Sequence, residues 1–510
     1  MHTSDTGAPT ANGPELRRSL NVWEAIGVSI ALMAPAMAAN INPQGTAGAV
    51  GRAVPLAFAL ATFGALLIAY SFVRLTQRFH HAGSVYGFVG ATIGPRAGIF
   101  SGWLLAIAYA MFAIYTAIAA GRFVTDEVVT SGIWPGAPGY MGFVFAGLAL
   151  LVVLYYATRT VQGGTRFMLL VEGLTVLLIL VVTAVVLAKL LGHSTPAGQT
   201  FDLNVFSPAK GTSLSNVFLG VVFGFLSFAG FEGATTLGEE TTNPRRDVPR
   251  AVAGTVLFGG VFFVIVSAVE VMGFGVGDKG VTAFVNSPSL MGDLGTAYLG
   301  SWIGHIITIG AAISAASCAT ACTVGSSRLV YALSRDGAGP APLKRLSSTH
   351  QVPGRAVGVL VGASAAFCGI GWLISNGVPF QVAAAAGTAG TLILLLAYLM
   401  ATLGCIRLVF FTGQRTVSRW EFLIPAAGLI VLGYTIWRNL YPFPIGSAWW
   451  GPGIFLAITV LCGLFVLARS DVAKSAGARL TATEGLAPAD SDGIGVSRTE
   501  VPAESRTPLG

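Results

Sequence analysis

The chain has 510 residues, of which 54% are hydrophobic and 10% are charged, and its formal net charge is +7. Soluble globular domains carry about 25% charged residues, and nucleic-acid binding needs a basic surface on a soluble domain. The composition therefore excludes an ordinary soluble enzyme or a nucleic-acid-binding domain, and it indicates a protein that lies in a lipid bilayer.

Apolar segments long enough to cross a bilayer, at about 20 residues each, recur along nearly the whole chain. We predict an all-α polytopic membrane protein with about twelve transmembrane helices. They lie at about residues 22–50, 53–75, 97–121, 140–158, 166–191, 213–238, 250–275, 297–333, 356–375, 378–405, 421–441 and 449–469.

The remaining residues form two polar tails. Residues 1–20 lack the apolar core and cleavage site of a removable signal peptide. Residues 471–510 are rich in Ala, Gly, Ser and Pro without periodicity, which is typical of a disordered segment. We therefore predict a cytoplasmic N-terminal tail at 1–20, one transmembrane domain at 21–470 and a disordered cytoplasmic C-terminal tail at 471–510.

The distribution of lysine and arginine predicts the orientation. With twelve spans both termini share a side, and the loops on that side hold sixteen Lys and Arg residues. The opposite side holds six, namely Arg52, Arg122, Lys189, Lys210, Lys279 and Arg438. Cytoplasmic loops are the ones rich in Lys and Arg, so we expect both termini to be cytoplasmic and the protein to lie in the cell (cytoplasmic) membrane.

The residues that carry enzymatic or metal chemistry are sparse. Cys318 and Cys322 share a helix face, but no histidine or further cysteine completes a metal site, so we interpret both as packing residues. No zinc-protease, Walker or nucleophile-elbow motif occurs. We expect no cofactor, no metal and no enzymatic activity.

Two spans carry helix-breaking residues at their centres. The first reads VWEAIGVSIALMAPAMAANINPQG, where Pro35 removes a backbone hydrogen bond. The sixth reads NVFLGVVFGFLSFAGFEGATTLGEE, where Ser227–Gly230 and Gly233 predict a flexible segment. Interrupted helices at matching positions in two halves indicate a transporter site at the membrane midplane. The alternative is a simple proline kink and a glycine packing face formed by Gly220 and Gly224.

Several segments resemble a known family. FAGFE followed by EETTNPRRDVPR, within 228–250, is similar to a signature of amino acid permeases of the amino acid–polyamine–organocation (APC) superfamily. Further support comes from VGRAVPLAFALA at 50–61, RFHHAGSVYGFVGATIGPRAGIFSGW at 78–103 and SSRLVYALSRDGAGP at 326–340. The resemblance covers about residues 20–440. The family's first helix usually breaks at a G-[AS]-G triplet, where this chain has Pro35-Ala36-Met37.

The resemblance implies two inverted repeats of five helices plus two further helices, with the first and sixth helices broken, and transport by alternating access. The amides of Ala36, Met37 and Ala38 would begin the second half of the first helix and bind a substrate carboxylate. Carbonyls near Ala31–Ala34 and Leu226–Ala229 would receive the ammonium group. The candidate substrate-binding residues are Met33, Ala34, Pro35, Ala36, Met37, Ala38, Tyr109, Leu226, Ser227, Phe228, Ala229 and Gly230.

Acidic residues inside a bilayer are costly and need a reason. Glu232 follows the sixth-helix break, where it is either a proton-coupling carboxylate or a structural cap for unwound backbone. Glu172 lies in the fifth span, a helix that lines an ion site in related transporters. It is either a second coupling candidate or the partner of an arginine at the cytoplasmic end. We expect Glu270 to extend toward the membrane surface from its helix end.

These features predict a permease that takes up amino acids by proton-coupled symport. No acidic residue lies within the breaks themselves, so a neutral amino acid is favoured over a substrate with a second positive charge. The expected partners are the substrate, H⁺ and the lipid bilayer, without nucleic acid. The alternatives are an exchanger of an amino acid against its amine, a non-transporting membrane sensor and a membrane enzyme.

Overall fold

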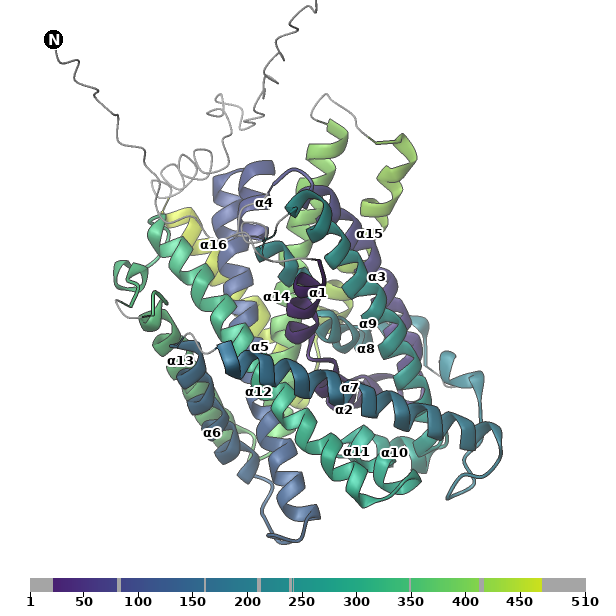
Figure 1. The fold of residues 1–510 in the computed structure, drawn as a ribbon. Helices are drawn as coiled ribbons and strands as arrows, with labels where there is room; N and C mark the ends of the chain where they lie inside the picture. Colours follow the sequence, from purple (N-terminus) through teal and green to yellow (C-terminus); the bar gives the residue numbers. More distant parts are fainter. Residues whose placement is uncertain are drawn as a thin grey trace, which may run out of the picture.

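The computed structural model describes residues 22–79, 84–159, 162–208, 212–237, 241, 243–347, 350–411 and 417–469. The predictions for the two tails lie outside these residues. Within them every element is helical, and the long helices form one bundle (Figure 1). The α-helices are α1 Val22–Met33, α2 Pro35–Val50, α3 Val54–Thr76, α4 Val85–Thr92, α5 Pro95–Thr130, α6 Met141–Ala157, α7 Gln162–Leu191, α8 Leu214–Phe228, α9 Pro244–Phe274, α10 Asp278–Asn286, α11 Leu290–Tyr298, α12 Ser301–Arg335, α13 Gly354–Ile374, α14 Pro379–Ile406, α15 Leu423–Leu440 and α16 Trp450–Ala468.

Shorter helical segments connect or extend these elements. The 3₁₀ segments are η1 Leu203–Phe206, η2 Phe231–Leu237, η3 Ala341–Lys344, η5 Arg419–Phe422 and η6 Gly446–Trp449, and η4 Arg407–Phe411 is a π-helix. Nine helices in the described part of the chain are long and apolar enough to cross a membrane, and α6 and α8 are shorter apolar helices. The chain is therefore a multi-pass helical membrane protein. The count of twelve crossings and the inverted repeats stay predictions.

The observed helices differ from the predicted spans mainly at their ends. Each predicted span contains a helix, but α5 continues to Thr130, beyond the predicted end at 121. The segment RFVTDEVVT, which follows Gly121, contains neither glycine nor proline, so the helix continues until Ser131 and Gly132. Three short helices, α4, α10 and α11, were not expected, because segments of eight or nine residues show little periodicity.

Close packing in the bundle centre depends on small residues. A methyl group at Gly224 of α8 would lie 2.6 Å from the Cβ of Ala61 on α3, and one at Gly220 would lie 2.9 Å from Thr46 on α2. Gly220 and Gly224 thus form a packing face, as the alternative for the sixth span proposes. Helix interfaces in membranes use small residues in this way, because they let backbones approach closely. The break in this span lies further on, at Gly230.

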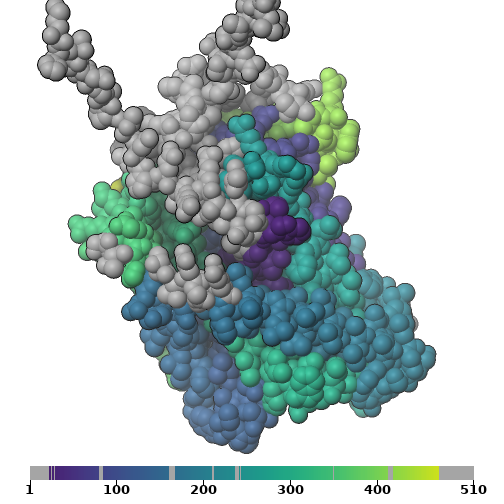
Figure 2. Space-filling model, in the orientation of Figure 1, coloured from purple at the N-terminus to yellow at the C-terminus, as the bar shows by residue number. Residues whose placement is uncertain are grey.

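One helix crosses over the two halves of the first span. In Figure 1, α7 runs obliquely in front of α2 and α12, and it contacts α1, α2, α9, α11 and α12. Figure 2 shows a band of blue α7 atoms across the middle of this face. Residues on the inner face of α7 therefore lie close to the point where α1 ends and α2 begins.

Candidate functional site

The first span breaks where the proline predicts. α1 ends at Met33, Ala34 adopts a left-handed conformation (φ 45°, ψ 60°), and α2 begins at Pro35. Ala34 still donates to the Ile30 carbonyl at 3.0 Å, so the chain turns only after this bond. Pro35 has no N–H and occupies the first helical position, where a helix needs no donor.

The amides at the start of α2 are bonded to groups within the protein. Ala36 N–H donates to the Glu172 carboxylate (Oε1) at 2.9 Å, and Met37 N–H donates to the Ser314 hydroxyl at 3.2 Å. Ala38 N–H donates to the Ala34 carbonyl at 2.8 Å. The three amides expected to be open to a substrate carboxylate are therefore occupied in this structure. Two of their partners come from helices distant in sequence, α7 and α12.

The sixth span breaks at a glycine. α8 ends at Phe228, Ala229 is extended (φ −56°, ψ 125°), Gly230 has φ 103°, and the chain continues as η2. A methyl group at Gly230 would lie 2.6 Å from the Cβ of Leu32 on α1. Only glycine fits this position, because the backbone conformation and the close approach both exclude a side chain.

Glu232 fixes the unwound turn locally. Its Oε2 accepts from Gly230 N–H at 3.1 Å, and its Oε1 accepts from the Tyr109 hydroxyl of α5 at 2.7 Å. The side chain is fully buried. These contacts support the structural alternative for Glu232, since each oxygen satisfies a buried donor.

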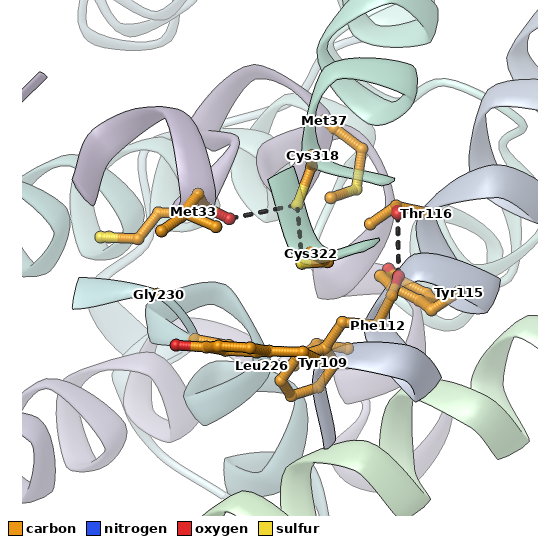
Figure 3. A pocket seen from close by; sticks show the side chains of 12 residues that line it. Met33, Met37, Tyr109, Phe112, Tyr115, Thr116, Leu226, Gly230, Cys318 and Cys322 are labelled. Atoms are coloured by element: carbon orange, nitrogen blue, oxygen red, sulfur yellow. Dashed lines mark hydrogen bonds between the residues drawn. The ribbon is translucent and has the colours of Figure 1, made fainter. Parts of the chain in front are cut away.

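A small, partly enclosed cavity lies between the two breaks (Figure 3). It has a volume of about 20 Å³, which is room for one or two water molecules. In the described part of the chain its lining carries no charged side chain and is mostly apolar. The lining residues are Leu32, Met33, Met37, Tyr109, Phe112, Tyr115, Thr116, Leu226, Ala229, Gly230, Cys318 and Cys322.

Half of the twelve candidate binding residues line this cavity, namely Met33, Met37, Tyr109, Leu226, Ala229 and Gly230. Four further candidates are buried around the first break and do not line the cavity, namely Ala34, Pro35, Ala36 and Ala38. Ser227 and Phe228 face other helices. The Ser227 hydroxyl accepts from the Asn42 amide of α2 at 2.6 Å, and the Phe228 ring packs at 5.7 Å, centroid to centroid, on Phe263 of α9.

Other lining residues were not anticipated. Phe112 and Thr116 lie three and seven residues after Tyr109 on α5, and this spacing puts them on the same helix face. Their spacing from Tyr109 could therefore have identified both residues from the sequence. Cys318 and Cys322 also line the cavity, their sulfurs 3.9 Å apart, and Cys318 donates to the Leu32 carbonyl at 3.1 Å. From the sequence we interpret them as packing residues because no histidine or further cysteine completes a metal site, and the sequence does not show which face of α12 points inward.

The structure bears on the expectations for two acidic residues, Glu172 and Glu270. Glu172 is nearly buried, and none of the ion pairs between described side chains involves it. Its pairing with an arginine at the cytoplasmic end stays a prediction, because the side chain of Arg166 lies outside the described residues. The expectation that Glu270 reaches the membrane surface is wrong. Glu270 is fully buried and neither carboxyl oxygen has a hydrogen-bond partner. The cause is that α10 and α11 pack against α9 and cover its end.

Polar side chains of α2 tie its remaining length to neighbouring helices. Asn40 accepts from the Ser289 hydroxyl at 3.0 Å and from Met291 N–H at 2.9 Å. Gln44 accepts from the Arg122 guanidinium of α5 at 2.8 Å. Burial raises the pKa of Asp293 on α11, whose carboxylate accepts from the Ser287 hydroxyl at 2.6 Å. This polar network connects α2 to α5 and to the segment around α10 and α11.

A second set of polar contacts joins η2 to α1 and to the residue before α4. Ala234 N–H donates to the Ser29 hydroxyl of α1 at 2.8 Å, and the hydroxyls of Ser84 and Thr235 are 2.7 Å apart. Each broken helix therefore takes part in a separate set of polar contacts, α2 with α5 and the segment around α10 and α11, and η2 with α1 and the residue before α4.

Comparisons with known proteins agree with this geometry. The chain is 24% identical over 368 residues to the branched-chain amino acid permease of Bacillus subtilis (strain 168), covering 68% of this chain and 74% of the relative. It is 27% identical over 334 residues to the low-affinity putrescine importer of Escherichia coli (strain K12), covering 65% and 70%. An uncharacterized transporter of Mycobacterium tuberculosis (strain ATCC 25618 / H37Rv) is 28% identical over 432 residues, covering 82% and 90%. The amino acid permease family matches residues 24–470, and the chain, with its two broken helices around a small cavity, belongs to that family.

Proposed function

We propose that this permease takes up a neutral amino acid across the cytoplasmic membrane by alternating access, together with protons. The observation that carries the proposal is the cavity between the two helix breaks, whose lining carries no charged side chain in the described part of the chain. An apolar lining with a few polar groups suits an aliphatic side chain. The branched-chain amino acid permease among the relatives is in keeping with such a substrate.

The proposal also includes proton coupling by Glu172 and Glu232, and an orientation with both termini in the cytoplasm. Glu172 and Glu232 are buried beside the two breaks, since the carboxylate of each accepts a hydrogen bond from an amide of a broken helix. A buried carboxylate beside a substrate site is a position from which a proton can be carried. The excess of Lys and Arg in alternate loops supports cytoplasmic termini, with substrate entering from the side of α10 and α11.

A second candidate substrate is an amine without a carboxylate. The putrescine importer among the relatives and the acidic Glu172 at the first break both favour it. Such a protein could also exchange an amino acid for its decarboxylated amine.

The test is uptake into proteoliposomes of purified protein with a panel of labelled amino acids and amines. Each compound is measured with and without an inward proton gradient and with unlabelled compound inside. We expect gradient-driven accumulation of aliphatic neutral amino acids. Uptake that requires internal substrate and ignores the gradient would identify an exchanger, and transport of amines alone would identify an amine carrier. Binding without transport would identify a sensor.

A further inference from the structure

The start of α2 holds a carboxylate that belongs to the protein. Glu172 comes from α7, 136 residues away in sequence, and its Oε1 accepts from Ala36 N–H at 2.9 Å. Positive partial charge and free amides make a helix N-terminus favourable for an anion. This is also the position where a substrate carboxylate would bind in the proposed function. In this structure the Glu172 carboxylate occupies that position.

The geometry allows one carboxylate at a time. Ala36 lies between Met33 and Met37 in sequence, and both of these residues line the cavity. Pro35 has no N–H, Met37 N–H is bonded to Ser314, and Ala38 N–H is bonded to the Ala34 carbonyl. Ala36 N–H is therefore the amide at this helix start whose partner is a charged group. A second carboxylate at Ala36 would meet the first at close range in a low-dielectric site, where like charges repel strongly.

Among the side chains that the structure describes, no charged group contacts Glu172. Its contacts are Ala36 N–H and the Ser314 side chain of α12, which lies within hydrogen-bonding reach. The titratable groups on the packed helices are engaged elsewhere or lack a contact with it. Among them are Glu270 on α9, Asp293 on α11, and His305, Cys318 and Cys322 on α12. The other charged groups of these helices lie near the start of α9, at residues 245–250, and near the end of α12, at residues 328–335. Lys189 on α7 itself donates to the Tyr298 carbonyl at 2.6 Å.

We infer that Glu172 and the substrate carboxylate bind Ala36 N–H alternately, and that this exchange couples the proton to the substrate. A proton from the outer solution bonds to the Glu172 carboxylate and neutralises it. The neutral acid is a weaker acceptor, because hydrogen bonds to charged groups are roughly twice as strong. The substrate carboxylate then takes Ala36 N–H. After the inner side opens, the substrate leaves, Glu172 releases its proton to the inner solution, and the carboxylate binds Ala36 N–H again.

This inference rests on the proposed function and adds a property that a structural glutamate lacks. Substrate binding should take up one proton per molecule bound. Above the pH at which Glu172 protonates, the apparent Kd for a neutral amino acid should therefore rise up to tenfold for each pH unit. A decarboxylated amine does not compete for Ala36 N–H, so its affinity should not fall in this way.

The experiment measures binding of L-valine and of its amine, 2-methylpropan-1-amine, to purified full-length protein between pH 5.5 and 8. Proton uptake is followed in weak buffer with a pH indicator dye. In Glu172→Gln the neutral amide keeps the size of the side chain. We expect this variant to bind L-valine independently of pH, to bind it more tightly than the parent at pH 8, and to take up no proton.

The matched control is Glu270→Gln, which removes a fully buried carboxylate of α9 that bonds neither helix break. It should still take up a proton when L-valine binds. Proton uptake by the parent protein needs no variant, so the test does not depend on the folding of Glu172→Gln.

Three results would overturn the inference. If the pH dependence and proton uptake are the same in Glu172→Gln and the parent, the inference fails while amino acid transport stands. If the parent binds L-valine without pH dependence and Glu172→Gln does not bind, Glu172 only supports the break. If the parent binds the amine but not L-valine, and Glu172→Gln loses the amine, Glu172 is a counter-ion and the neutral amino acid proposal fails as well.

Discussion

The two helix breaks are built differently. At the sixth span, the amide of Gly230 is bonded by Glu232, two residues further along the same segment. At the first span, the amides of Ala36 and Met37 are bonded by Glu172 and Ser314, which are 136 and 277 residues away. The sixth break uses a glycine with φ 103°, whereas the first uses a proline preceded by a left-handed alanine.

The difference concerns which contacts can change during transport. The bond between Gly230 N–H and Glu232 lies within one segment, so it persists when neighbouring helices move. A break held by α7 and α12 changes its bonds as soon as one of these helices shifts relative to α2. We therefore expect the sixth break to act as a fixed turn and the first to act as the part that responds to substrate and proton.

The largest effect is expected from filling the fixed turn. In Gly230→Val the new Cβ would lie 2.6 Å from the Cβ of Leu32 and would need an unfavourable φ of 103°. We expect uptake to be abolished while the protein still inserts and purifies as a single species, measured in proteoliposomes and by gel filtration. Gly433→Val on α15, where a Cβ would meet nothing within 4 Å, should transport normally. Normal transport by Gly230→Val would remove the fixed turn from the comparison.

The second prediction compares the acids that hold the breaks. Glu232→Ala leaves two buried donors, Gly230 N–H and the Tyr109 hydroxyl, without an acceptor. Glu172→Ala leaves Ala36 N–H without an acceptor, whereas the Ser314 hydroxyl, the other contact of Glu172, keeps its bond from Met37 N–H. Each unsatisfied buried donor costs about 1–3 kcal/mol of the free energy of unfolding. Thermal unfolding in detergent should therefore show the larger loss for Glu232→Ala. Equal losses would mean that the local and distant contacts are equally important for stability.

A third, smaller effect concerns the polar contacts of α2 on the side of α10 and α11, which we expect to close the cavity there. Asn40→Ala removes the acceptor for Ser289 and Met291, which we expect to weaken this closure by about 1–2 kcal/mol. Cys318 and Cys322 then report on it, because they line the cavity. An impermeant thiol reagent added on that side should label them roughly ten times faster, since 1.4 kcal/mol is a factor of ten.

Asn286→Ala is the control for this variant, because Asn286 is exposed on α10 and bonds only within its own helix, at Thr282. It should leave the labelling rate unchanged. If both variants behave alike, Asn40 is not part of the closure.

The smallest effect is expected at Cys322. Its sulfur contacts Cys318 and lines the cavity without bonding either break. Cys322→Ala should change uptake by less than about threefold, because a small apolar side chain replaces a thiol that packs in the same way. In the parent protein, transported substrate should slow the reaction of a small permeant thiol reagent. Unchanged labelling in saturating substrate would place the substrate away from α12.

The positions of both breaks could be predicted from the sequence because their causes are local. Pro35 removes an N–H from the first span, and Gly230 supplies a conformation that other residues avoid. The groups that bond the exposed amides could not be predicted in the same way. Glu172 and Ser314 reach α2 from helices whose rotation depends on the packing of the whole bundle.

The cavity lining divides along the same line. Met33, Met37 and Gly230 follow from the breaks, and Phe112 and Thr116 follow from helical spacing once Tyr109 faces inward. Ser227 and Phe228 are next to a break, yet they face Asn42 and Phe263 because a helix turns by about 100° per residue. Nearness in sequence to a break therefore does not place a side chain in the cavity.

A helix start that accepts one carboxylate at a time also sets an energetic limit on accumulation. Exchange of Glu172 for a zwitterionic substrate moves one proton and one net positive charge per cycle. A membrane potential of 100 mV then contributes about 2.3 kcal/mol, and a gradient of one pH unit contributes about 1.4 kcal/mol. Together these sustain a concentration ratio of roughly 500-fold, since each 1.4 kcal/mol is a factor of ten. A steeper gradient of substrate would need a second proton, and the α2 N-terminus has no second position for it.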